Sequence, residues 1–450
     1  MLAVTELAPK PHERASASRL RNLNAHRHTT SREPAIDKLY DVVPSPTRFR
    51  SLFPSTNIPW KFTFGLLLTL TLLHLHLART STSHAPSRPP LLLPSSKTFK
   101  IVIFEDLHFG EAESTARGPS QDRATLRLMR SVLAAEAPDL VVLNGDLVTG
   151  GDTFRENSTS YVDLLVQPMV EARVPWASAY GNHDSRLNLS REAIFETETK
   201  YHLSLTSRPD DPSLPGLTNY FLPIAHRPDT GRPSAILWFF DSRGGRKSLE
   251  AGGTGRVGDE GDLIDKWVGP QTASWFLTTH ALLAREHGRV LPSLAFVHIP
   301  TRSYLPAQDR ISASFAPGMN HNDPADTQSN DPSPAHPAAA FVAALGSVEG
   351  LHSVHAAHNH GNDWCAPFDM RRGAKPFLCF GRHTGYGGFG GWTRGARVLE
   401  LQFHESGEVA LGPGEGMEVE TWIRLEGGDV VGRVSLNETY GVDEYPVTEE

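Results

Sequence analysis

The chain has 450 residues, which is enough for one large domain or two. Its net charge of −8 provides no basic surface of the kind that nucleic acids require, so no nucleic-acid partner is expected. With only two cysteines, a Cys-rich zinc site and a disulfide-stapled scaffold are both excluded. Any metal ion must therefore be held by His, Asp, Glu or Asn side chains.

The front of the chain is not expected to belong to a folded core. Residues 1–60 are basic and rich in Ser, Pro and Asn, without periodicity, which predicts disorder. Residues 61–78 contain an uncharged, Leu-rich run, and we predict a signal-anchor transmembrane helix there, although roughly 16 apolar residues span about 24 Å of a ~30 Å hydrocarbon core. The basic flank favours a cytosolic N-terminus. A cleaved signal peptide and a buried helix of a soluble protein are the alternatives.

Several features bear on the compartment of the remaining chain. Residues 79–97 are rich in Ser and Pro and are expected to form a linker. Three N-glycosylation sequons give modest support for a lumenal or extracellular domain on a single-pass membrane protein; they begin at Asn157, Asn188 and Asn437. In that setting Cys365 and Cys379 could form a disulfide; two buried free thiols are the alternative.

From Thr98 onward, short apolar segments alternate with segments of helical periodicity. Strands are predicted at residues 99–104, 139–143, 174–179, 293–297 and 351–355. Helices are predicted between them, at residues 121–136, 161–172 and 271–286. This alternation is typical of a mostly parallel sheet, in which functional sites lie at the carboxyl ends of the strands.

Each of these five strands is followed by polar residues that could bind a metal ion. They are Asp106 and His108, Asp146, Asn182 with His183 and Asp184, His298, and the pair His358 and His360. Turns or helix caps would explain any one of them, but hardly five in succession. Carboxylate, amide and imidazole together suit Mn, Fe or Zn, and the number of ligands is sufficient for two ions. Two ions ~3.5–4 Å apart can activate water and hold a phosphoryl group.

In this order, the motifs resemble those of the calcineurin-like metallophosphoesterases, over about residues 99–402. The stretch Phe380–Gly388 is similar to the fungal and plant branch labelled purple acid phosphatase 29-like. The resemblance implies an α/β fold, a four-layer αββα sandwich with two mixed β-sheets, over residues 98–404. Residues 405–450 would then be an acidic C-terminal extension with a strand or two.

The resemblance also implies a role for each site residue. The first metal ion would be bound by Asp106, His108 and His360, and the second by Asn182, His298 and His358. Asp146 would bridge the two. His183 would contact the phosphate and act as general acid, oriented by Asp184. Arg382 and His383 are candidates for phosphate contacts, with a structural turn as the alternative.

Three positions depart from the family pattern or add to it. Ala357 stands where a glycine is usual, which would cost about 1 kcal/mol if the backbone there needs a positive φ. Thr149 stands where truly purple enzymes have a tyrosinate ligand, so no tyrosinate charge-transfer band is expected. Glu105 is an additional acid, expected to point away from the metal ions.

These observations predict a membrane-anchored, dinuclear Mn-, Fe- or Zn-dependent enzyme that hydrolyses phosphate monoesters, either small molecules or phosphoproteins. In the resemblance, a metal-bridging hydroxide attacks phosphorus and His183 protonates the leaving group. A phosphodiesterase of the same fold and a catalytically silent, membrane-tethered binding module are the alternatives. The presence of every expected ligand argues against the silent module.

Overall fold

A computed structural model describes residues 88–226, 232–256, 258–369, 376–404 and 416–446, all within the compact unit Ser83–Glu450. The predicted disordered segment 1–60 and the predicted signal anchor 61–78 lie outside the described residues. Among the helices of the described ranges, none is long and apolar enough to cross a membrane.

One of the two sheets is six-stranded and carries the first three predicted strands. Its order is β13-β12-β11-β2-β3-β4, in which β2, β3 and β4 run parallel and β11, β12 and β13 are antiparallel to their neighbours. The strands are β2 (Thr98–Phe104), β3 (Leu140–Asn144), β4 (Trp176–Ala179), β11 (Gly395–Phe403), β12 (Met417–Leu425) and β13 (Val430–Ser435).

The other sheet is seven-stranded, in the order β1-β5-β6-β7-β8-β10-β9, and its centre is parallel. β5 and β9 are antiparallel to their neighbours β6 and β10, so this sheet is mixed as well. The strands are β1 (Leu91–Leu92), β5 (Tyr220–Ala225), β6 (Pro233–Phe240), β7 (Ser293–Val297), β8 (Leu351–Ala356), β9 (Cys365–Pro367) and β10 (Phe377–Phe380).

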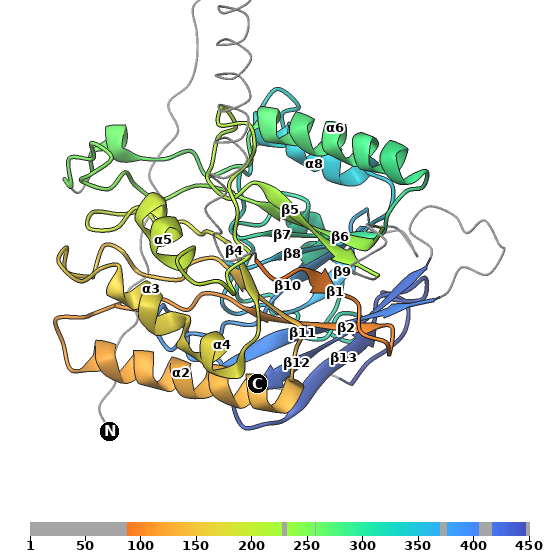
Figure 1. Cartoon of the computed structure of the whole chain (residues 1–450), viewed down its shortest axis with the longest axis horizontal. Helices are drawn as coiled ribbons and strands as arrows, with labels where there is room; N and C mark the ends of the chain where they lie inside the picture. The colour runs from red at the N-terminus through yellow and green to blue at the C-terminus, as the bar shows by residue number, and fades with distance from the viewer. Residues whose placement is uncertain (1–87, 227–231, 257, 370–375, 405–415, 447–450) are drawn as a thin grey trace, which may run out of the picture. The chain divides into compact units, whose positions relative to one another are not determined.

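Helices cover the outer faces of both sheets. The six-stranded sheet is covered by α2 (Arg117–Glu136), α3 (Ser160–Leu165), α4 (Gln167–Ala172) and α5 (Arg191–Glu198). The seven-stranded sheet is covered by α6 (Pro270–His287), α7 (Tyr304–Arg310) and α8 (Ala338–Ser347). Figure 1 shows the two groups of helices on opposite sides of the sheets. The predicted four-layer αββα sandwich is confirmed. The single helix predicted at 161–172 is two short ones, α3 and α4, on either side of Val166.

The alternation of side chains along β2 explains why this strand is an uninterrupted apolar run. Ile101 and Ile103 pack into the core between the sheets, whereas Val102 and Phe104 pack under the helices of the outer layer. Both faces are therefore buried, as expected for the central strands of a sandwich with helices outside it.

The folded unit extends beyond the predicted domain, 98–404, at both ends. Within the predicted linker 79–97, Leu91 and Leu93 are buried and β1 pairs with β5. On the other side, β12 pairs with β11 along nine residues and its Trp422 is buried, so residues 417–435 are part of the six-stranded sheet and not an extension. Composition suggested the two boundaries, but partner strands far along the chain decide them.

Cys365 and Cys379 form a disulfide bond, the first of the two alternatives. They lie directly opposite each other in the antiparallel pair β9–β10, with a Cα–Cα distance of 4.0 Å. Both residues are buried in the core between the sheets, where the Tyr440 hydroxyl donates to the Cys365 carbonyl.

Candidate metal centre

The five predicted strand ends come together at one edge of the sandwich, three from one sheet and two from the other. Contacts between the sheets join them directly. The Asn144 side chain at the end of β3 donates to the carbonyl of His355 in β8, at 3.3 Å. Below the two-histidine motif, the Ala357 amide donates to the carbonyl of His298, at 2.9 Å. The segments after β2, β3, β7 and β8 are therefore neighbours in space.

Four of the residues at this edge adopt left-handed backbone conformations. The φ angles of Asp106, His108, Asp146 and His358 are 50°, 48°, 50° and 74°. Such values are uncommon for residues other than glycine and cost of order 1–3 kcal/mol each. The positive φ of the last motif falls on His358 and not on Ala357. Alanine at position 357 therefore carries none of the strain that the sequence comparison suggested.

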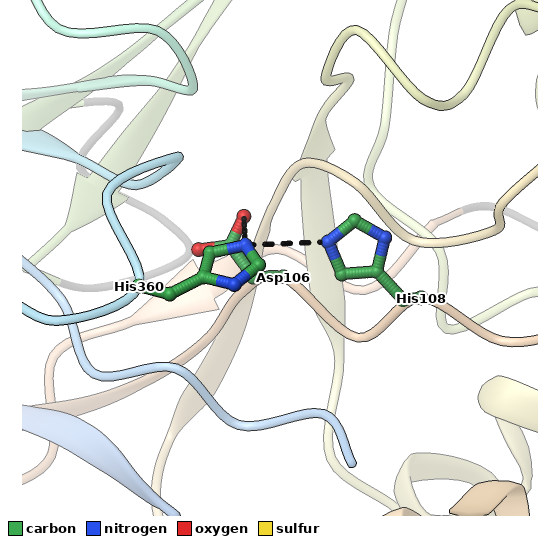
Figure 2. A group of neighbouring side chains, drawn as sticks. All are labelled: Asp106, His108 and His360. Atoms are coloured by element: carbon green, nitrogen blue, oxygen red, sulfur yellow. Dashed lines mark hydrogen bonds and ion pairs between the residues drawn. The ribbon is translucent and has the colours of Figure 1, made fainter. Parts of the chain in front are cut away.

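The first cluster of side chains consists of Asp106, His108 and His360 (Figure 2). The Nε2 atoms of the two histidines are 3.4 Å apart, and Nε2 of His360 lies 3.6 Å from Oδ1 of Asp106. Oδ1 of Asp106 is buried and has no hydrogen-bond partner among the described residues.

The second cluster consists of Asp146, His298 and His358. Oδ2 of Asp146 lies 3.2 Å from Nε2 of His298 and 3.9 Å from Nε2 of His108. One carboxylate oxygen therefore lies between the two clusters, at the place where a bridging ligand is needed. Asn182 is adjacent: Gly181 packs so tightly on Asp146 and His298 that a Cβ there would collide with both.

The ring nitrogens of the histidines are oriented by a second set of contacts. Nδ1 of His108 is hydrogen-bonded to Thr149 Oγ1 at 3.0 Å. Nδ1 of His298 is hydrogen-bonded to the Asn144 carbonyl at 2.9 Å, and Nδ1 of His360 to the Phe389 carbonyl at 2.9 Å. Their Nε2 atoms therefore face the clusters. In His358 the other ring nitrogen, Nε2, is hydrogen-bonded to Asp326 at 3.2 Å, so Nδ1 is the nitrogen that remains to bind a metal ion. Metal-binding histidines are usually held in this manner.

These residues fit two metal ions. In the part of the chain that the structure describes, Asp106 Oδ1 and Asn182 Oδ1 are buried without hydrogen-bond partners, and the buried His298 Nε2 lies 3.2 Å from the Asp146 carboxylate. An unpaired buried polar atom costs about 1–3 kcal/mol, and more when it is charged. Two such atoms at one edge, each belonging to an expected ligand, are explained together if cations bind there. Imidazole, amide and carboxylate ligands accept Mn, Fe or Zn.

Burial and neighbouring charges set the protonation of these groups. Burial lowers the pKa of His108 to about 3, so its imidazole is neutral and able to bind a metal ion. Burial alone would raise the pKa of Asp146, but the neighbouring His298 and His183 bring it well below its usual range. Glu105 behaves in the opposite way: burial, reinforced by the Asp106 charge, raises its pKa well above the usual value.

His183 lies beside the clusters, on the solvent side. Its amide donates to Asp146 Oδ1 at 2.7 Å, and its ring centroid lies 5.0 Å from that of His108. The ring is partly exposed, and its Nδ1 makes no hydrogen bond to any described residue. The backbone therefore fixes the position of His183, while the ring faces the space where a substrate would bind.

Asp184 does not orient the His183 imidazole, and that prediction is wrong. Its Oδ1 accepts hydrogen bonds from the amides of Leu147 and Val148, and its Oδ2 accepts one from the amide of Gly181. Burial, together with the Asp146 charge, raises the pKa of Asp184 to about 7. Asp184 is thus a positioning residue that connects the loop after β3 to the loop after β4.

Comparison with known proteins agrees with this geometry. Residues 99–292 match the calcineurin-like phosphoesterase family. The chain contains a calcineurin-like phosphoesterase domain. The family uses a dinuclear metal centre, in accord with the two clusters of ligands.

Two curated relatives and one solved structure illustrate the similarity. The chain is 28% identical over 393 residues to the Arabidopsis thaliana protein named "Probable inactive purple acid phosphatase 14", which covers 81% of this chain and 90% of the relative. It is 27% identical over 342 residues to phosphatase DCR2 of Saccharomyces cerevisiae, covering 73% of this chain and 54% of that protein. A dimetal phosphatase from Danio rerio is similar with a TM-score of 0.46 and 14% identity, over 78% of this chain and 100% of that one.

The two candidate phosphate-binding residues of this phosphoesterase domain lie in different surroundings. His383 is buried against the first cluster, with its ring centroid 3.9 Å from that of His360. Burial, reinforced by His360, holds its pKa well below the usual value. The guanidinium of Arg382 is bound by Asp363 at 2.8 Å and by the Thr393 carbonyl at 2.8 Å. These partners indicate a structural role for Arg382, as in the alternative of a structural turn.

The structure adds residues that the motifs did not reveal. Thr149 and Asp326 hold His108 and His358, respectively. A cleft of about 540 Å³ contains Asn182 and His183, and its other walls come from residues outside the motifs, namely Arg186, Gly245, Arg246, Leu263, Ile264, Asp265, Lys266 and Trp267. Seven of these eight residues lie in the segment 245–267, outside every strand and helix predicted from the sequence. Its contribution becomes visible only when the segment is folded against the strand ends.

Proposed function

We propose that this chain is a dinuclear metal-dependent phosphoesterase that hydrolyses phosphate monoesters. One observation carries the proposal: the unpaired ligand atoms of two side-chain clusters converge on the shared carboxylate of Asp146, directly beside a cleft that contains His183. When bound, two metal ions would lower the pKa of water and neutralise charge on the phosphoryl oxygens.

The residues of the chain supply the remaining parts of the reaction. Asp106, His108 and His360 would hold one ion, and Asn182, His298 and His358 the other, with Asp146 shared. His183 would donate a proton to the oxygen of the leaving group, because its imidazole lines the cleft and is partly exposed. Thr149 and Asp326 would keep the rings of His108 and His358 in position.

The ligand set supports an active enzyme over a silent binding module. A relative in Arabidopsis thaliana is named as probably inactive. Activity of this chain is supported by two groups of Asp and His side chains that could each hold a metal ion, and by the hydrogen bonds that orient His108, His298 and His360. Thr149 stands where a tyrosinate ligand would be needed, and its hydroxyl is hydrogen-bonded to His108. We therefore expect no tyrosinate absorption in the visible range.

The test compares the hydrolysis of p-nitrophenyl phosphate and bis-p-nitrophenyl phosphate by the full-length protein supplied with Mn, Fe or Zn. Faster monoester cleavage is expected. Faster diester cleavage would replace the proposal with a phosphodiesterase of the same fold. Absence of turnover with every metal, in a sample with native circular dichroism and bound metal, would favour the silent module.

We further propose that the phosphoesterase domain lies in the lumen of the secretory pathway or outside the cell. The Cys365–Cys379 disulfide supports this, because such bonds persist in oxidising compartments. Among the three sequons, Asn437 is exposed, whereas Nδ2 of Asn157 and Asn188 donates to Glu113 and to the Thr153 carbonyl. Endoglycosidase should increase the mobility of the wild-type protein and leave Asn437→Gln unchanged. No shift in the wild type would contradict the proposal.

A further inference from the structure

The cleft beside His183 shares two lining residues with a second, smaller hollow that contains none of the candidate metal ligands. Arg186 and Arg246 line both the cleft of about 540 Å³ and a hollow of about 100 Å³. The smaller hollow is completed by Leu187, Lys247, Gly255, Arg256 and Asp262. At ~30 Å³ for each water molecule, it has space for about three waters, which suits a compact group.

Cations dominate the walls of these two cavities, although the chain as a whole carries a net charge of −8. The cavities are lined by five cationic residues, Arg186, Arg246, Lys247, Arg256 and Lys266, and by two acidic ones, Asp262 and Asp265. Positive charges therefore outnumber negative ones in the cavities where a substrate would extend from the metal centre.

The two acidic residues already have partners within the protein. Asp262 accepts hydrogen bonds from the amides of Thr254 and Gly255, and Asp265 lies 3.6 Å from a guanidinium nitrogen of Arg243. Lys266 is likewise bound, by Asp326 at 2.9 Å. Asp262 also interacts electrostatically with Arg246, so the less compensated charge of the two shared arginines is that of Arg186.

Arg186 is held in place but its charge is not compensated. Its stem packs on Gly151, where a Cβ would lie 2.7 Å from the Arg186 Cδ. Across the described ranges, its guanidinium forms no ion pair or hydrogen bond, and the residue is partly buried. Arg246 is anchored by its amide, which donates to the Ser185 carbonyl, and by Nη1, which donates to the Asp259 carbonyl. A planar guanidinium in such a position is suited to bind phosphate oxygens.

We propose that the substrate of this site carries a second phosphate group, which binds between Arg186 and Arg246 while the scissile phosphate lies at the metal centre. This inference rests on the proposed function and adds a substrate class to it. A sugar bisphosphate and a nucleoside bisphosphate share the chemistry that the cavities recognise.

The test measures kcat/KM of the full-length protein on matched pairs of esters. The pairs are glucose 6-phosphate with glucose 1,6-bisphosphate, and AMP with adenosine 3′,5′-bisphosphate. At least one bisphosphate should be preferred over its monophosphate by about tenfold or more, as expected for a charged hydrogen-bonding partner. The pair with the larger preference identifies the class of scaffold. The preference should decrease as ionic strength rises.

Matched variants assign the preference to the arginines. The double variant Arg186→Gln/Arg246→Gln should lower the preference by about tenfold or more. Arg285→Gln, which removes an exposed cation from α6 outside both cavities, should not change it. Equal kcat/KM for mono- and bisphosphates, or a preference that persists in the double variant, would overturn the inference.

A binding measurement separates this inference from the proposed function. Calorimetric titration of glucose 1,6-bisphosphate and adenosine 3′,5′-bisphosphate into metal-loaded His183→Asn, with and without the two arginine substitutions, measures binding while turnover is suppressed. Absence of hydrolysis together with binding that the substitutions weaken about tenfold or more would reject the enzyme but retain the anion site. Hydrolysis without such binding, or no binding at all, would reject the second phosphate.

Discussion

The metal-ligand edge and the wall of the cleft are built in opposite ways. The candidate ligands follow strand ends and are buried, except for the half-buried Asn182 and His358. Hydrogen bonds to Thr149, the Asn144 carbonyl and the Phe389 carbonyl orient His108, His298 and His360. The cleft wall comes from loops, and its Leu263 is more than half exposed at 54%. The edge therefore has the properties of a fixed reaction centre, and the wall those of a surface that selects substrates.

The largest effect should come from the carboxylate that both clusters share. Asp146→Asn removes charge from the position between His108 and His298, so we expect loss of both metal ions and a fall in turnover of about 10³-fold or more. Metal content by mass spectrometry and kcat on p-nitrophenyl phosphate measure this. Near-native values of both would contradict the two-metal assignment.

His183 should affect chemistry and leave metal binding unchanged, which separates it from Asp146. His183→Asn should lower kcat on an alkyl phosphate by about 10²–10⁴-fold while metal content stays constant. The loss should be smaller on p-nitrophenyl phosphate, because nitrophenolate is a better leaving group and needs less protonation. Equal losses on the two substrates would be evidence against a general acid.

Thr149 tests whether the edge depends on residues that do not bind metal themselves. Thr149→Val removes the hydroxyl that holds Nδ1 of His108 and should weaken metal affinity by about 10–100-fold. Thr149→Ser keeps the hydroxyl and should restore most of it. Titration of the apo-protein with Zn²⁺ provides the measurement, and failure of serine to restore affinity would point to packing instead.

Asp122 in α2 gives the smallest effect and lies outside the metal-ligand set. Burial raises its pKa to about 6, even though it accepts a hydrogen bond from the Gly110 amide. A raised pKa means that the folded state holds a proton more tightly than the unfolded chain. The resulting stability is complete below about pH 4 and is lost as pH rises through about 6.

Asp122→Asn should therefore stabilise the protein at pH 8 by roughly 1 kcal/mol, after allowance for solvent screening. The difference in thermal midpoint between variant and wild type should shrink as pH falls below 6 and disappear towards pH 4. A difference that does not change between pH 4 and 8 would show that the Asp122 charge is unimportant. Asp152→Asn, at an exposed residue, is the matched control.

The sequence alone was sufficient for the order of the main elements and for the six Asp and His residues that the structure gathers in two clusters. Buried strands are recognisable as apolar runs, and a ligand that follows a strand directly is placed by that strand, as with Asp106 after β2 and His298 after β7. The resemblance of the five motifs added the sandwich and the division of ligands between two ions. Local sequence carries this information because each ligand lies within a few residues of the strand that positions it.

Only the tertiary structure decided how the remaining parts meet. It showed that β1 and β12 belong to the folded unit, through their pairing with β5 and β11. It showed that Asp184 accepts hydrogen bonds from the backbone of two loops, and that the left-handed φ is at His358 and not at Ala357. It also brought Asp326 to His358 and Arg186 to Arg246. These relations join residues far apart along the chain through hydrogen bonds and packing, which leave no periodic pattern in the sequence.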